Sequence, residues 1–88
     1  MVRPYKEIQL EKGFIRIFES NVNESELVWH RDKKDRVVIP LHSTDWKLQM
    51  DNELPKKFEK RKPIFIEAKK FHRLHAGKGK LITFIYES

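Results

Sequence analysis

The chain has 88 residues, with 19 Lys and Arg, 13 Asp and Glu, and no cysteine. This length suits a single domain over residues 1–88, and the lack of cysteine excludes disulfides, thiolate metal ligands and cysteine nucleophiles. The net charge of +6 favours an anionic partner. Because no stretch approaches the ~20 apolar residues that span a bilayer and the N-terminus lacks an apolar leader, we expect a cytoplasmic protein without membrane contact.

Short runs of β-branched and aromatic residues recur between polar breaks, a pattern typical of a β-sandwich or barrel. In chain order the predicted strands are Tyr5–Leu10, Phe14–Phe18, Glu26–Arg31, Arg36–Leu41, Trp46–Met50, Leu54–Phe58, Ile64–Glu67, Phe71–His75 and Leu81–Tyr86. Gly and Asn in the breaks, such as Gly77-Lys78-Gly79, favour chain reversal. The sequence therefore predicts an all-β fold of about nine short antiparallel strands with almost no helix.

The run Arg36–Leu41 is apolar on both faces, so both faces need a cover. The barrel interior provides one, and either a second copy in a homodimer or the N-terminal strands provide the other. Pro40 within the run indicates an edge or a bulge rather than a regular central strand. The small size of the chain is a separate reason to expect self-association.

Two histidines on predicted strands, His30 and His72, lie far apart in the sequence. Residues at i and i+2 on a strand share a face, so Asp32 projects with His30, and Arg36 follows them inward. A His/Asp/His set is a suitable ligand group for Fe, Mn, Zn or Ni.

The spacing of these residues resembles the two sequence motifs of the cupin superfamily, over residues 24–76. The resemblance implies a small jelly-roll barrel. The positions of the first motif fall on His30, Asp32, Arg36 and Ser43, and those of the second on Arg61, Glu67, Lys69, His72 and Ala76. Only the two histidines match. The segments Trp29–Arg36, Trp46–Pro55 and Phe71–Arg73 are also similar to short cupin-like proteins of marine phages and bacteria, most of which lack an assigned activity.

Arg36 stands where the family has a metal-binding Glu, and a permanent guanidinium opposes a divalent cation. Three interpretations stay open. His30, Asp32 and His72 bind a metal as a facial triad; Arg36 and the histidines hold a carboxylate or phosphate; or the charged groups pair and the histidines are only hydrogen-bonded wall residues.

We favour a protein that binds a small polar or anionic ligand, or a metal ion, in the barrel mouth near His30, Asp32, Arg36 and His72. A metal-dependent oxygenase, isomerase or hydrolase is an alternative. The incomplete ligand set and the lack of a nucleophile motif or Gly-rich phosphate loop favour a non-enzyme over it.

A second alternative is a nucleic-acid-binding barrel that uses the basic residues of the second half, Lys56-Lys57, Lys60-Arg61-Lys62, Lys69-Lys70, Lys78 and Lys80. Because Phe58, Phe65 and Phe71 fall on core-like positions, a solvated basic rim is favoured instead. Trp46 is predicted to be core, and for Trp29 packing is favoured over stacking on a sugar or base.

Overall fold

The computed structural model describes residues 4–23, 25 and 27–88, and these form eight β-strands. The strands are β1 (Tyr5–Gln9), β2 (Phe14–Phe18), β3 (Arg36–Pro40), β4 (Lys47–Met50), β5 (Lys56–Lys57), β6 (Ile64–Ile66), β7 (His72–His75) and β8 (Leu81–Glu87). The all-β prediction is confirmed. Among the described residues, no helix is long and apolar enough to cross a membrane.

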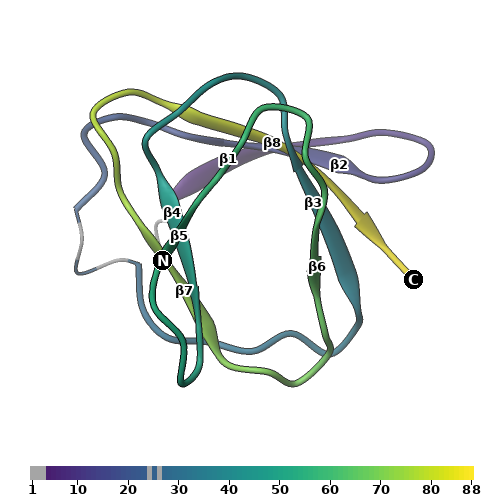
Figure 1. Ribbon diagram of the computed structural model, residues 1–88. Coiled ribbons are helices and arrows are strands. Elements are labelled where there is room, and N and C mark those ends of the chain that lie inside the picture. The colour runs from purple at the N-terminus through teal and green to yellow at the C-terminus, as the bar shows by residue number, and fades with distance from the viewer. Residues whose placement is uncertain (1–3, 24, 26) are drawn as a thin grey trace.

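The strands form two antiparallel sheets. The larger has the order β1-β2-β8-β3-β6 and the smaller the order β5-β4-β7. Figure 1 looks along the barrel, with β4, β5 and β7 on one side and β3 and β6 on the other. The sheets enclose a common interior, as in the predicted jelly-roll barrel.

The strand count is eight rather than about nine, because the predicted strand Glu26–Arg31 does not form in the described residues. Glu26 itself lies outside the described residues. The rest of that segment contributes only an isolated bridge between His30 and His72. Two backbone hydrogen bonds make this bridge. The His30 amide donates to the His72 carbonyl at 3.0 Å, and the His72 amide donates to the His30 carbonyl at 2.9 Å.

The expectation that Arg36–Leu41 is not a regular central strand is wrong, since β3 lies between β8 and β6, although its pairing with β6 ends at Val38, so that Pro40 itself lies at a local edge. The Leu41 amide donates to Ile82 of β8. The backbone nitrogen of residue 40 therefore points toward the β6 side of β3. Residue 40 lies past Val38, which is the last β3 residue that pairs with β6. The N–H that proline lacks would have had no partner there.

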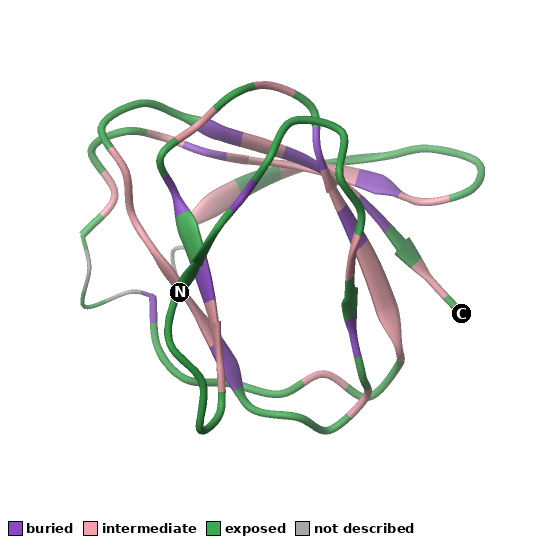
Figure 2. Cartoon of the chain, viewed as in Figure 1, coloured by how far each residue is buried: buried purple, intermediate pink, exposed green. Residues whose placement is uncertain are grey.

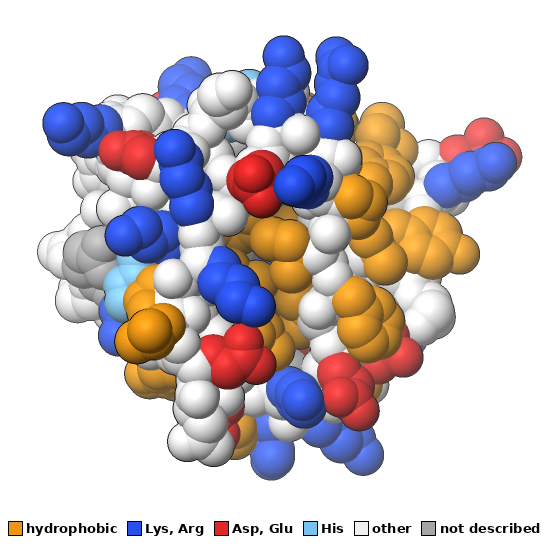
Figure 3. Space-filling model, in the orientation of Figure 1, with side chains coloured by type: hydrophobic (Ala, Val, Ile, Leu, Met, Phe, Trp, Pro, Cys, Tyr) orange, Lys and Arg blue, Asp and Glu red, His pale blue; other side chains and the backbone are white. Residues whose placement is uncertain are grey.

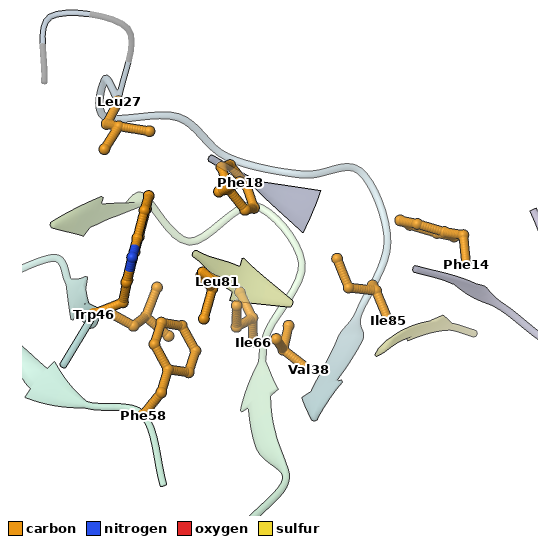
Figure 4. Close-up of a cluster of buried hydrophobic side chains, with 10 residues drawn as sticks. Phe14, Phe18, Leu27, Val38, Trp46, Phe58, Ile66, Leu81 and Ile85 are labelled. Carbon is orange, nitrogen blue, oxygen red and sulfur yellow. The ribbon is translucent and has the colours of Figure 1, made fainter. Parts of the chain in front are cut away.

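The hydrophobic core lies between the two sheets (Figure 2) and consists of Phe14, Phe18, Leu27, Val38, Trp46, Leu48, Phe58, Ile66, Leu81 and Ile85. Trp46 is 0% exposed and packs against Phe18 with ring centroids 5.5 Å apart (Figure 4). Its indole N–H donates to the Gly79 carbonyl at 2.7 Å. The core assignment of Trp46 is confirmed. Phe58 is also buried, whereas Phe65 and Phe71 are exposed, so the core-like interpretation of those two was wrong.

Thr83 at the centre of β8 is 1% exposed, and its hydroxyl has no hydrogen-bond partner. An unsatisfied buried hydroxyl costs about 1–3 kcal/mol. We therefore expect Thr83→Val to raise the free energy of unfolding by about 1 kcal/mol in urea denaturation. Thr44→Val is the matched control, because the Thr44 hydroxyl accepts the Trp46 amide at 3.2 Å and its loss should destabilise the fold. A destabilised Thr83→Val variant would contradict this account.

Candidate metal-binding site

The backbone bridge between His30 and His72 brings the two predicted histidines side by side. His72 is the first residue of β7, and His30 lies in the segment that leads to β3. Their ring centroids are 4.4 Å apart, with the planes inclined at 63°. The strand pairing thus places the two imidazoles together, His72 buried and His30 on the exposed side.

Both imidazoles are oriented by backbone carbonyls. His30 Nδ1 lies 3.0 Å from the Val28 carbonyl and His72 Nδ1 lies 2.9 Å from the Lys70 carbonyl. Because a carbonyl oxygen only accepts hydrogen bonds, each Nδ1 carries a proton, and Nε2 is the ring nitrogen that is left to bind a metal when the imidazole is neutral. Burial lowers the pKa of His30, which favours the neutral form that binds metals. Carbonyl partners of this kind are the usual support of histidine ligands.

Asp32 supplies a carboxylate to the same point. Its Oδ2 atom lies 3.2 Å from His72 Nε2, and it is buried without a properly formed hydrogen bond. Burial alone raises the pKa of Asp32, but contact with His72 and the charge of Arg36 outweigh it, so the pKa lies below the ordinary value. A divalent cation between Oδ2 and Nε2 would attract both atoms, and its binding requires that Nε2 carry no proton.

The positive charge of Arg36 is offset by two carboxylates. Its Nε donates to Glu87 at 2.8 Å, and its Nη1 lies 3.4 Å from Asp32 Oδ1. Two carboxylates thus surround one guanidinium and offset its charge. The expectation that the Arg36 charge opposes a cation did not take into account the negative charge of Glu87. Glu87 reaches Arg36 only because β3 and β8 pair in this register.

The ligand atoms of His30, Asp32 and His72 all lie within 4.8 Å of one another. Atoms bound to one ion at ~2.1 Å are at most ~4.2 Å apart, so small side-chain movements suffice to close the set. Two imidazoles and one carboxylate suit Fe, Mn, Zn and Ni. The donor chemistry and the convergence of the three ligand atoms therefore fit a transition metal.

A cavity of about 270 Å³ adjoins this cluster, and all four predicted pocket residues, His30, Asp32, Arg36 and His72, line it. Arg16 and Thr83 also line it, and neither was predicted from the sequence. Their inward direction follows from strand alternation, but that they line the same cavity as His72 depends on how the two sheets face each other.

The predicted basic segment borders a separate, open groove of about 990 Å³. Figure 3 shows Lys and Arg side chains around a hollow with hydrophobic side chains inside. Ion pairs join three of the groove's lysines to glutamates: Lys56–Glu53 at 3.8 Å, Lys62–Glu59 at 3.4 Å and Lys70–Glu67 at 3.5 Å. These pairs reduce the positive charge that a nucleic acid would contact. Nucleic-acid binding stays a prediction.

No protein-family model matches the sequence, and no curated protein is similar to it. Solved structures are similar in fold. An RmlC-like cupin family protein with a double-stranded β-helix fold from Methanocaldococcus jannaschii has a TM-score of 0.72 at 9% identity, covering 99% of this chain and 82% of that one.

Two larger proteins contain a similar barrel. The DMSP lyase DddQ from Ruegeria pomeroyi has a TM-score of 0.73 at 8% identity over 85% of this chain, which spans only 36% of the lyase. The Fe(II) form of HppE in complex with substrate has a TM-score of 0.69 at 11% identity over 100% of this chain and 55% of that one. At such identities the likeness concerns the fold alone, and by that measure this chain is a small barrel of the cupin type.

Proposed function

We propose that this barrel binds a divalent transition metal ion through His30, Asp32 and His72 and holds a small polar or anionic molecule in the adjoining cavity. The observation that carries the proposal is the convergence of three ligand atoms within 4.8 Å, one of them a buried carboxylate oxygen without a hydrogen bond. The similar barrel of Fe(II) HppE supports the choice of a transition metal.

The residues around the three ligands have distinct tasks in this proposal. The Val28 and Lys70 carbonyls fix the ring orientations, and Arg36 holds Asp32 Oδ1 so that Oδ2 faces the histidines. A bound ion would supply Lewis acidity and open coordination positions toward the cavity. His30, Asp32 and His72 occupy only part of the coordination sphere of such an ion, so a ligand in the cavity has room to approach it.

The test is elemental analysis and calorimetry of tag-free protein that has been stripped with a chelator and then titrated with Fe(II), Mn(II), Zn(II) or Ni(II). We expect about one ion per chain for at least one metal. The His30→Ala/His72→Ala variant should bind none. His75→Ala is the control, because His75 pairs with Gln49 at 2.8 Å, outside the cluster, and should leave metal binding unchanged. Wild-type protein that binds no metal after reconstitution would refute the proposal.

A further inference from the structure

The walls of the cavity beside the candidate metal site are mainly apolar, which bears on what it binds. Twelve of its lining residues are apolar: Pro4, Tyr5, Phe18, Leu27, Val28, Val38, Leu48, Phe58, Ile66, Leu74, Leu81 and Ile85. Four of the polar lining residues, His30, Asp32, Arg36 and His72, form one cluster. The other two are Arg16, whose charge is paired with Glu7 at 2.8 Å, and Thr83, which lies opposite Arg16 across β2 and β8. The cavity thus has a charged cluster at the candidate metal site and mainly apolar walls elsewhere.

This division constrains the chemistry of an occupant. A molecule with hydroxyls along its whole length would leave them without partners against the apolar walls, at a cost of about 1–3 kcal/mol each. An apolar body instead gains about 25 cal/mol for each Å² removed from water. At the charged cluster a bound cation favours a negative group, because the Arg36 guanidinium is already paired with Asp32 and Glu87.

Size is limited as well. A volume of about 270 Å³ corresponds to roughly nine water-sized groups at ~30 Å³ each. An occupant of that size has on the order of ten non-hydrogen atoms.

We propose that the occupant is a small organic carboxylate with an aliphatic or aromatic body, its carboxylate at the His30, Asp32 and His72 cluster and its body against Phe18, Leu27 and Leu81. This inference rests on the proposed function, since the cation completes the site for the carboxylate. It replaces the general expectation of a small polar or anionic ligand with an amphipathic one.

The test is calorimetry of the Zn-loaded wild-type protein with acetate, butyrate, phenylacetate, gluconate and inorganic phosphate. Phenylacetate should bind about tenfold or more tighter than acetate, because its ring buries apolar surface. Gluconate should bind no tighter than acetate. Tighter binding of gluconate or phosphate than of phenylacetate would overturn the inference.

Val38→Phe provides a second measurement, because Val38 lines the cavity and is not one of the three metal ligands, so the larger side chain takes up cavity volume. In folded variant protein, phenylacetate affinity should fall about tenfold or more while metal stoichiometry is unchanged. Protein that binds metal but shows no preference for apolar bodies would refute only this inference. Protein that binds no metal would refute the proposed function itself.

A separate observation concerns the outer face of the larger sheet. Cross-strand register sets Ile8, Ile15, Phe84 and Ile39 in one row, and Tyr86, Val37 and Phe65 in another. Ile17 and Ile82 form a third pair, beside Lys6. Along the outward positions of these strands, only Lys6 on the edge strand is charged, although 36% of the whole chain is charged.

In the described part of the chain this face is only partly covered. Phe65 is 61% exposed, and Ile8 and Tyr86 are exposed as well. The alternative in which the N-terminal strands cover β3 is wrong, because β1 and β2 extend the same sheet. A contiguous apolar face of this kind is typical of an interface.

We infer that this face binds a second copy of the chain. Two copies with a net charge of +6 each repel one another, and a face that is nearly free of charge allows them to approach. Strand spacings of ~4.8 Å across and ~3.4 Å along give a projected area of roughly 400 Å² for five strands of five residues. This projected area is about half of the ~800 Å² that each partner buries in a standard interface. It does not include the uneven surface of the side chains or the exposed flanking residues Leu10 and Leu41. We therefore expect a reversible dimer.

Sedimentation equilibrium of the full chain tests this inference across micromolar to sub-millimolar concentrations. We expect a dimer at the upper end that becomes more stable with added salt, which screens the like charges. Phe65→Lys/Tyr86→Lys, at two exposed positions of the face, should be monomeric throughout, and Leu54→Lys, at an 84% exposed position outside it, should dimerise as the wild type does. A wild-type monomer at every concentration, or dimerisation of the double variant, would contradict it.

Discussion

Asp32→Asn should lower the affinity of the protein for a divalent transition metal by about a hundredfold or more while the fold is retained. An amide is a neutral and weaker ligand than a carboxylate, but the larger effect comes from Arg36. Its Nη1 lies 3.4 Å from Oδ1 and is a donor, so it selects the amide oxygen at that position. The amide NH₂ then takes the place of Oδ2, 3.2 Å from His72 Nε2, and donates to its lone pair.

The Asn variant would thus satisfy the group that is unpaired in the wild type and at the same time block a metal-binding nitrogen. Its free energy of unfolding without metal should equal or exceed that of the wild type. Asp35→Asn is the matched control, because Asp35 Oδ1 accepts the Ala68 amide at 2.7 Å and an Asn oxygen can do the same. Calorimetry checks both variants. Equal metal affinity in Asp32→Asn and the wild type would show that Asp32 is not a ligand.

Alternation of apolar and polar residues was enough to predict most strands. Phe14–Phe18 was predicted with the bounds of β2, because its buried ends and the turn at Gly13 are local features. Leu54–Phe58 shrank to the two residues of β5, since pairing with β4 involves only Lys56 and Lys57. Strand extent depends on the neighbour's length and register, which a single run of residues does not encode.

The candidate site was predicted more fully than its electrostatics. The cupin resemblance indicated that His30, Asp32 and His72 converge, and the structure brings their ligand atoms together. The role of Arg36 could not be predicted, because its main partner, Glu87, lies 51 residues away on β8. The exposure of Phe65 also follows from tertiary structure, since strand alternation does not tell which face of a sheet meets the core.

Trp46→Ala should destabilise the fold more than any of the other substitutions proposed above, with a loss of about 3–5 kcal/mol. The indole is fully buried against Phe18, and its N–H satisfies the Gly79 carbonyl. Domains of this kind are stable by only about 5–15 kcal/mol, so this loss is a large fraction of the total stability. Urea denaturation followed by circular dichroism measures the loss, and Trp46→Phe, which keeps most of the ring volume, should lose less.

The second tryptophan provides the matched control. Trp29 is 40% exposed, so Trp29→Ala should cost less than about 1 kcal/mol. Similar losses for Trp46→Ala and Trp29→Ala would contradict the central place of Trp46 in the core.

Trp46 immediately precedes β4, and β4 pairs with β7 so that Met50 lies opposite His72. Loss of Trp46 should therefore loosen the strand that carries a metal ligand, and a metal that binds only the folded chain should restore about 2.7 kcal/mol at a hundredfold excess over its Kd.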